Sequence, residues 1–122
     1  MKCKCSEEAR SIAKQLPSAE DCSRIAAAFA QLGDCTRLRV LWLLCHSERC
    51  VAGIAEAVGM SSPAVAHHLK LLRSAGLIVG RREGREMRYR LGDTAECREI
   101  HRAIDALFHV NCPGCVHDDE HK

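Results

Sequence analysis

Two short amphipathic segments separated by a tight turn, within residues 51–76, constrain the fold of this chain more than any other feature. Apolar residues recur at helical spacing over Val51–Val58, and Gly59 ends this first segment. A second helical pattern covers Ser61–Arg73 and stops before Gly76. Two short helices joined by a glycine-containing turn are the signature of a helix-turn-helix, whose second helix enters the major groove of DNA.

The second segment has the start and the faces that a recognition helix requires. Ser61 or Ser62 caps it, and Pro63 lies in its first turn, where the missing N–H of proline costs nothing. The residues predicted to face the core, at i, i+4 and i+7, are Val65, Leu69 and Leu72. Small and polar residues on its other faces are predicted to contact bases or phosphates, and they are Ser61, Ser62, Ala64, His67, His68, Lys70 and Arg73.

An arginine-rich β-hairpin follows at once. Leu77–Val79 is predicted as a strand, Glu83–Arg85 as the turn and Met87–Leu91 as the returning strand. The residues predicted to lie against an adjacent groove or the flanking phosphates are Arg81, Arg82, Arg85 and Arg88. A helix-turn-helix followed by such a hairpin predicts the winged form of the motif, with double-stranded operator DNA as its partner.

The charge distribution agrees with a polyanionic partner. Residues 60–91 hold seven basic and two acidic residues, a net charge of +5, whereas the rest of the chain carries −3. A basic concentration on a nearly neutral protein is typical of a surface that binds nucleic acid. The alternative is an ordinary solvated face.

Further helical patterns complete a mostly α fold with one small antiparallel β-hairpin. They cover residues 6–16, 19–32, 35–46 and about 94–110. We divide the chain into an N-terminal extension with the first helix (1–18), a winged helix-turn-helix domain with its C-terminal helix (19–110) and a tail that contains Cys and His (111–122). A homodimer is predicted, because one recognition helix reads too few base pairs for a specific site. The first and last helices are predicted to form its interface, because their apolar stripes have no other partner once the middle helices fill the core.

Nine cysteines are a high count for 122 residues. The N-terminus lacks an apolar signal core, and no segment approaches the roughly 20 apolar residues that span a bilayer, so we expect a cytoplasmic protein without a membrane partner. In a reducing compartment, clustered cysteines indicate metal ligation or thiol chemistry rather than disulfides. Three cysteines in helical patterns are predicted to lie in the core, namely Cys22, Cys35 and Cys45.

Specific motifs resemble the ArsR/SmtB family of metal-responsive repressors. The similarity extends over about residues 25–108, and the matching segments are Leu32–Arg39, Glu48–Ala55, Gly59–Ser61, Ala64–Arg73 and Gly76–Ile78. The resemblance implies a homodimeric winged-helix repressor that occupies its operator when metal-free and releases it when an inducer binds. It also implies that the inducer is a thiophilic or borderline metal ion.

The resemblance implies two positions for a sensory site. Cys50 matches the first thiolate of one site, whose second cysteine position is Ala52 here, and Cys3 and Cys5 would add thiolates from the N-terminal extension. Three sulfurs suit Cd²⁺, Pb²⁺ or As(III), whereas Zn²⁺ favours a fourth ligand. The other site lies on the last helix and pairs ligands across the dimer. Asp93 and His109 match two of its positions, whereas Ala95 and Ala106 occupy the other two.

Two further candidate sites come from spacing alone. Cys97 and His101 lie at i and i+4 of the last helix, so both side chains can meet one ion. Cys112 and Cys115 form a C-x-x-C turn in the tail, which can chelate a metal through two thiolates. The remaining ligands of a metal held by Cys112 and Cys115 could come from His109, His117, Cys3 and Cys5.

Two other functions compete with metal sensing. The same fold can respond to oxidants or persulfides through its thiols, for instance between Cys50 and a terminal cysteine. The third hypothesis is a thiol-disulfide enzyme that acts through Cys112 and Cys115. Such redox motifs usually lie in a βαβ unit, which the predicted helices and strands do not include. No hydrolase or transferase constellation is present, so we expect neither an enzyme nor a small organic substrate.

Overall fold

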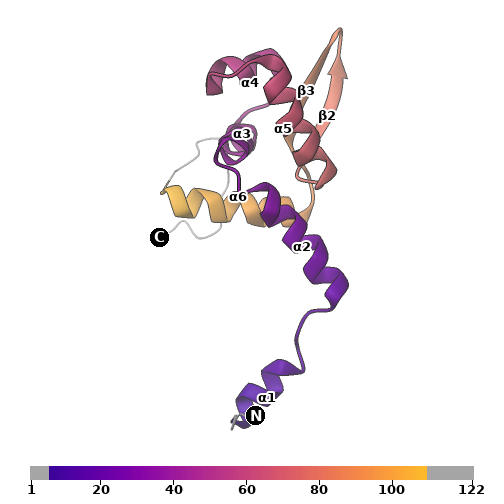
Figure 1. Ribbon diagram of the computed structural model, residues 1–122, viewed down its shortest axis with the longest axis vertical. Coiled ribbons are helices and arrows are strands. Elements are labelled where there is room, and N and C mark those ends of the chain that lie inside the picture. Colours follow the sequence, from indigo (N-terminus) through magenta and orange to yellow (C-terminus); the bar gives the residue numbers. More distant parts are fainter. Residues whose placement is uncertain (1–5, 110–122) are drawn as a thin grey trace.

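The computed structural model of the chain describes residues 6–109, which form six helices and one three-stranded antiparallel sheet (Figure 1). The elements are α1 (Glu7–Ala13), α2 (Ala19–Gln31), α3 (Cys35–His46), β1 (Arg49–Cys50), α4 (Val51–Val58), α5 (Ser62–Ser74), β2 (Ile78–Glu83), β3 (Glu86–Leu91) and α6 (Ala95–Phe108). The predicted winged helix-turn-helix architecture is confirmed, with α4 and α5 as the two helices and β2–β3 as the wing. Among the described residues, no helix has the length and apolar character needed to cross a membrane.

Helix α3 lies at the centre of the core. Its Val40, Leu41 and Leu44 are at most 2 % exposed, and α3 contacts α4, α5, β3 and α6. The residues that close around it from the other elements include Ile54, Val65, Leu69, Leu72, Leu77, Ile78 and Ile104. Because the three apolar residues predicted for α5 are all buried here, the opposite face of α5 is directed to solvent.

Local capping chemistry sets the helix starts, as the sequence predicts. The Ser61 hydroxyl accepts a hydrogen bond from Ala64 N at 3.3 Å, so Ser61 is the cap of α5. Asp34 caps α3 by accepting from Arg37 N, and this bond holds the pKa of Asp34 below its ordinary value. Gly59 ends α4 at φ 73°, a left-handed conformation that makes the tight turn possible. Thr94 caps α6, because its hydroxyl accepts a hydrogen bond from Cys97 N at 3.1 Å.

The wing is longer than the sequence predicts. Strands β2 and β3 pair from Ile78↔Leu91 to Glu83↔Glu86, so the expected three-residue turn is wrong and the ladder continues to its tip. Gly84 makes this possible, because its φ of 63° allows a tight two-residue turn. Gly80 also contributes, since a Cβ there would lie 2.9 Å from Met87 Cε. Strand β1, which the sequence analysis missed, pairs with β3.

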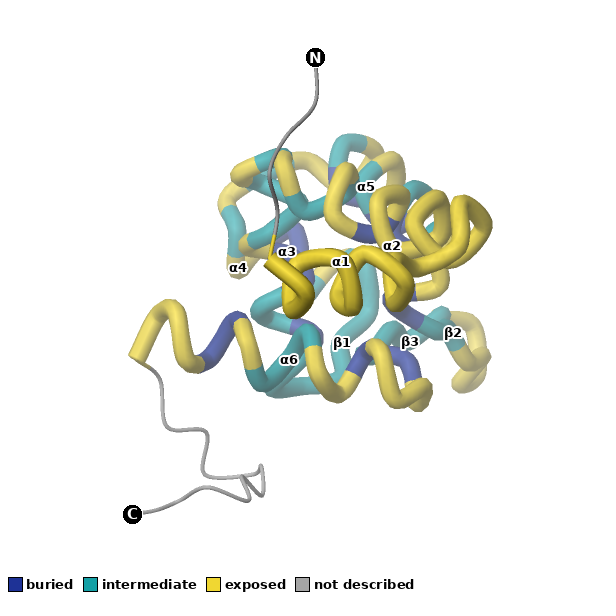
Figure 2. Tube along the Cα trace, turned by 90° about the horizontal axis from the view of Figure 1, so that it is seen from below, coloured by how far each residue is buried: buried dark blue, intermediate teal, exposed yellow. Residues whose placement is uncertain are grey.

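Helix α1 stands away from the rest of the molecule (Figure 1). It ends at Ala13 rather than Leu16, although backbone hydrogen bonds continue as a turn to Leu16. None of its residues, all within the described range, is buried, and its trace is exposed throughout in Figure 2. Large apolar side chains therefore remain exposed along α1, α2 and the end of α6, namely Ile12, Leu16, Ile25, Phe29, Leu107 and Phe108.

The predicted core positions of Cys22 and Cys35 are wrong, because both residues are exposed. Within α2, which the structure describes throughout, Ala28 alone is buried, so Cys22 lies on a part of the helix that the core does not reach. Cys35 begins α3 and lines an open apolar pocket between α3, α4 and the end of α6. Cys45 is half-buried and packs against the core, in agreement with the prediction.

We expect Leu41→Ala to lower the free energy of unfolding by about 2–5 kcal/mol, because Leu41 is fully buried and its truncation leaves a cavity among the surrounding elements. Urea unfolding at fixed protein concentration measures this loss. Leu43→Ala, a half-buried position on the same helix, is the matched control and should cost clearly less. Equal losses for the two variants would contradict a core centred on α3.

Candidate functional site

The exposed face of α5 presents short polar side chains at the N-terminal end of the helix. Ser61 and Ser62 are exposed there, and Ala64 is half-buried beside them. His67, Lys70 and Arg73 are exposed along the same helix, opposite its buried apolar stripe. The helix dipole and the N–H groups of the first turn favour an anion at this end. A helix anchored in this way can approach base edges and phosphates with its free face.

His68 differs from its neighbour His67 because α3 holds it. Arg37 Nε donates a hydrogen bond to His68 Nδ1 at 3.2 Å, and the same guanidinium donates to the side chain of Gln31 at 2.8 Å. His68 is half-buried as a result, whereas His67 is exposed. The predicted pair of DNA-contacting histidines therefore consists of one exposed ring and one ring that joins α5 to α3.

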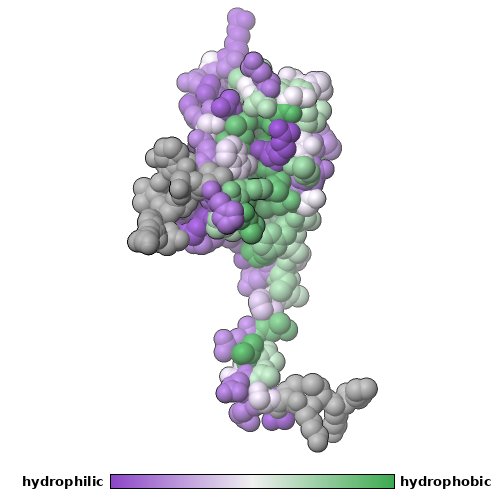
Figure 3. Space-filling view, turned by 90° about the vertical axis from the view of Figure 1, so that its left-hand side faces the viewer, coloured by the Kyte–Doolittle hydropathy of each residue, from purple (hydrophilic) through white to green (hydrophobic). Residues whose placement is uncertain are grey.

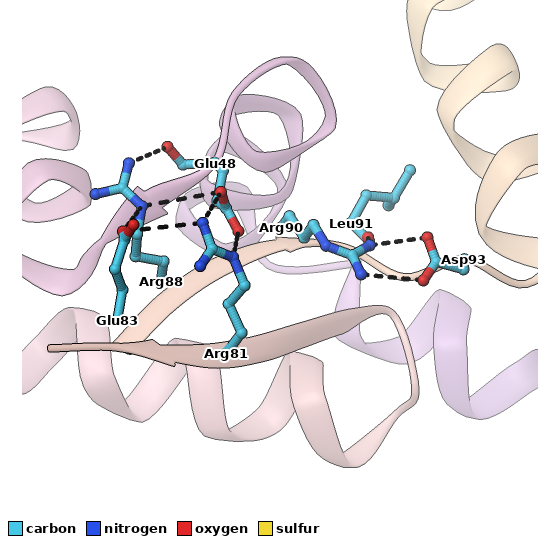
Figure 4. Close-up of polar contacts among 7 residues, drawn as sticks. All are labelled: Glu48, Arg81, Glu83, Arg88, Arg90, Leu91 and Asp93. Atoms are coloured by element: carbon cyan, nitrogen blue, oxygen red, sulfur yellow. Dashed lines mark hydrogen bonds and ion pairs between the residues drawn. The ribbon is translucent and has the colours of Figure 1, made fainter. Parts of the chain in front are cut away.

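Glu48, just before β1, is bound to the middle of the wing (Figure 4). Its carboxylate accepts two hydrogen bonds from Arg81, at 2.8 and 3.0 Å, and its carbonyl accepts one from Arg88 at 3.1 Å. Arg81 and Arg88 are direct neighbours across the β2–β3 ladder, so this acid offsets the repulsion between them. The hydrogen bond from Arg81 holds the pKa of Glu48 below its ordinary value, and Glu48 raises the pKa of Arg81.

The wing arginines therefore divide into two kinds. Arg81 and Arg88 form ion pairs with Glu48 and Glu83. Arg82 and Arg85 are exposed near the tip and form no ion pair with any residue in the range 6–109 that the structure describes. The same holds for two cations on α5, Lys70 and Arg73.

Within residues 6–109, no three of the predicted metal ligands form a group that could hold one ion. Cys50 is half-buried and precedes α4 without capping it through its side chain. Cys97 is buried, and its thiol donates to the carbonyls of Gly76 and Leu77 at 3.4 and 3.6 Å. The metal ligands predicted at Cys3, Cys5, Cys112, Cys115 and His117 lie outside the described residues.

The two ligands predicted for a site across the dimer lie at opposite ends of α6. Asp93, before the helix, accepts two hydrogen bonds from Arg90, at 2.8 and 3.1 Å, which hold the pKa of Asp93 below its ordinary value (Figure 4). His109 caps the C-terminus in a left-handed conformation, with φ 56°. A shared ion between Asp93 of one protomer and His109 of the other stays a prediction.

His101 belongs to a group that the sequence analysis did not find. His46 at the end of α3 and His101 on α6 both direct Nε2 at the carboxylate of Asp105, at 2.9 and 3.0 Å. The three ligand atoms lie within 4.8 Å of one another, and Cys97 is not part of the group. Asp105 is 3 % exposed and each histidine is 12–13 % exposed. The signal available in the sequence was a charged residue, Asp105, next to the apolar stripe of the last helix.

The contact between Glu48 and Arg81 predicts a measurable titration. In an NMR titration, the carboxyl group of Glu48 should show a pKa below the ordinary glutamate value, and Arg81→Gln should move this pKa back towards it. Because the folded-state pKa is lowered, the stabilisation is present above the unfolded-state pKa and is lost as the pH falls through the folded-state pKa. A Glu48 pKa that does not change in Arg81→Gln would contradict this contact.

Comparison with known proteins shows which protein family this chain matches. The sequence profile described as "Bacterial regulatory protein, arsR family" matches residues 34–79, which include α3, α4 and α5. The HTH-type transcriptional regulator KmtR of Mycobacterium tuberculosis is 38% identical over 99 residues, which cover 81% of this chain and 73% of KmtR. A probable mercury resistance operon repressor of Streptomyces lividans is 40% identical over 68 residues, which cover 56% of this chain and 54% of that protein.

Solved structures agree on the fold. The homodimeric winged helix-turn-helix DNA-binding domain of a possible ArsR-family regulator from Mycobacterium bovis has a TM-score of 0.64, with 24% identity over 98% of this chain and 100% of that chain. At this identity the likeness concerns the fold alone. The identity with KmtR extends over most of both proteins. The chain therefore belongs to the ArsR/SmtB family of winged helix-turn-helix transcriptional regulators, which are DNA-binding proteins and not enzymes.

Proposed function

We propose that the chain is a homodimeric repressor that binds operator DNA through α5 and the wing and releases it when a thiophilic or borderline metal ion binds. The observation that carries the proposal is the position of the free cations. Lys70 and Arg73 on α5 and Arg82 and Arg85 on the wing lack ion-pair partners among the described residues, and all four are exposed. Unpaired cations flanking a recognition helix are suited to neutralise phosphates on both sides of a groove.

The exposed apolar residues support a homodimer. Ile12, Leu16, Phe29, Leu107 and Phe108 are 52–79 % exposed, and they come from α1 and the turn after it, from α2 and from α6. Figure 3 shows apolar side chains gathered in a band that runs from the body of the molecule down to the α1 end. Exposed apolar surface of this extent is typical of an interface. A second copy, contacting the first and last helices, would cover it and place two copies of α5 on one face.

Two considerations support a metal ion as inducer. The relative from Streptomyces lividans is named as a repressor of a mercury resistance operon. In this chain, Cys50 lies at the start of α4, so a metal bound there acts directly on the helix that precedes the recognition helix. The thiolates that would join it come from Cys3 and Cys5, with Cys112 and Cys115 as a separate pair. Cd²⁺, Pb²⁺, As(III) and Zn²⁺ are the candidate ions.

The central test is duplex binding by the reduced, metal-free protein, titrated with these four ions. At least one ion should weaken binding tenfold or more, which corresponds to about 1.4 kcal/mol of coupling. A duplex selected from a random pool serves as the probe. If no ion weakens binding, the proposed metal response is wrong. Release of the duplex by polysulfide or peroxide, reversed by a reductant, would then support the thiol-based alternative. If the metal-free protein does not bind duplex DNA even at low salt, the repressor proposal fails.

The division of the wing arginines predicts different salt dependences. Arg82→Gln and Arg85→Gln should each reduce the slope of log K against log [salt] by about 1, because each removes one phosphate contact. Arg81→Gln should change the slope less, since Glu48 already pairs with Arg81. Arg102→Gln on α6 is the control, because α6 lies away from the wing tip (Figure 1). Unchanged slopes for Arg82→Gln and Arg85→Gln would remove the wing from the DNA-binding surface.

A further inference from the structure

We propose that His46, His101 and Asp105 bind one borderline divalent metal ion in each protomer, of the class Zn²⁺, Ni²⁺ or Co²⁺, and that this ion regulates the wing. The regulatory part of this inference rests on the proposed function. The site is built within one chain from α3 and α6, and it contains no cysteine. It is therefore distinct from the thiolate sites around Cys50 and in the tail.

The geometry of the three side chains suits a metal ion. Both imidazoles direct Nε2 at the carboxylate of Asp105, and the three ligand atoms lie within 4.8 Å of one another. Ligands bound to Zn²⁺ at about 2.0–2.2 Å in a tetrahedral arrangement are themselves roughly 3.3–3.5 Å apart. The present distances of 2.9 and 3.0 Å between nitrogen and oxygen atoms need only small shifts to reach this spacing.

The surroundings hold the ligands in place. The ring of Trp42 packs on His46 with centroids 4.5 Å apart, and the rings of His46 and His101 meet edge to face at 5.0 Å. Asp105 is the buried charged residue of the described region, with 3 % exposure. A buried carboxylate is costly unless a positive charge and hydrogen bonds compensate it, and a divalent cation supplies that charge.

The ligand chemistry selects the class of ion. Two imidazole nitrogens and one carboxylate oxygen match the preferences of borderline divalent ions, whereas As(III), Pb²⁺ and Cd²⁺ are better served by thiolates. Each imidazole binds through Nε2 when its proton is on Nδ1, so the ion replaces the two contacts from Nε2 to the carboxylate. Three protein ligands leave a fourth position for water.

The site is connected to the wing through a short stretch of chain. His46 is the last residue of α3, and Glu48, two residues later, holds Arg81 of β2 and Arg88 of β3. Ser47, between them, accepts a hydrogen bond from Arg49 and donates one to the carbonyl of Leu43. An ion that shifts His46 towards α6 therefore acts on the anchor of the wing, and α6 also belongs to the proposed dimer interface.

The test measures metal binding without the thiolates. A variant of the full chain with Cys3→Ser, Cys5→Ser, Cys50→Ser, Cys112→Ser and Cys115→Ser should bind one Co²⁺ per protomer, with visible absorption bands of a nitrogen- and oxygen-ligated ion and no thiolate-to-metal charge-transfer band. Zn²⁺ should displace the Co²⁺. In this background, His101→Gln and Asp105→Asn should each weaken Co²⁺ binding by about 100-fold or more. Glu99→Gln, an exposed acid-to-amide change on the same helix, is the matched control and should leave binding unchanged.

Two outcomes would overturn the inference: no stoichiometric Co²⁺ binding in the thiolate-free variant, or binding that His101→Gln and Asp105→Asn leave unchanged. Because Asp105 is buried, His101→Gln and His46→Gln give a second pair of variants whose fold is checked by their duplex affinity without metal. If these variants bind duplex normally and Zn²⁺ still releases it, the regulatory role is wrong while the repressor proposal stands. If the unmodified metal-free protein binds no duplex, the repressor proposal fails, whereas Co²⁺ binding still decides the site.

Discussion

The packing of α3 determines where every functional surface of this protein lies. Helix α3 buries Val40, Leu41 and Leu44 at the centre of the core. Elements α4, α5, β3 and α6 all contact α3. Val65, Leu69 and Leu72 press α5 onto this centre, so the remaining face of α5 is directed outward. The core thus has a direct functional consequence, because the orientation of the recognition helix follows from the burial of its apolar stripe.

A second constraint is electrostatic and centres on Glu48. Without this residue, two arginines that face each other across the wing would repel. The carboxylate fixes Arg81, and the backbone carbonyl fixes Arg88, which leaves Arg82 and Arg85 near the tip for a partner. The basic character seen in the sequence is therefore not a uniform surface. Part of it stabilises the wing, and part of it is available to DNA.

Much of the fold could be predicted because its signals are local. The caps Ser61 and Asp34 and the turn at Gly59 depend on residues within a few positions, so the sequence indicates them directly. Strand β1 was missed because its two residues are extended only by pairing with β3. The wing ladder was underestimated because Arg81 and Arg82 interrupt the apolar pattern that strands usually show.

The site was predictable only in part, because several of its contacts join residues that are far apart in the sequence. The residues of α5 follow from its helical faces, but the pairing of Glu48 with Arg81 joins residues 33 positions apart. His46 and Asp105 are separated by 59 positions, so no spacing rule brings them together. His101 was singled out with Cys97, whereas the fold directs the thiol of Cys97 to the carbonyls of Gly76 and Leu77.

The central claim is that two copies of α5, each flanked by its wing, enter successive major grooves of duplex DNA. Hydroxyl-radical footprinting on a duplex selected by the reduced, metal-free protein tests it most directly. We expect two symmetric protected patches whose centres lie about 10 base pairs apart, one helical turn, with further protection at the flanking phosphates. A single patch without two-fold symmetry, or an unprotected duplex at saturating protein, would contradict it.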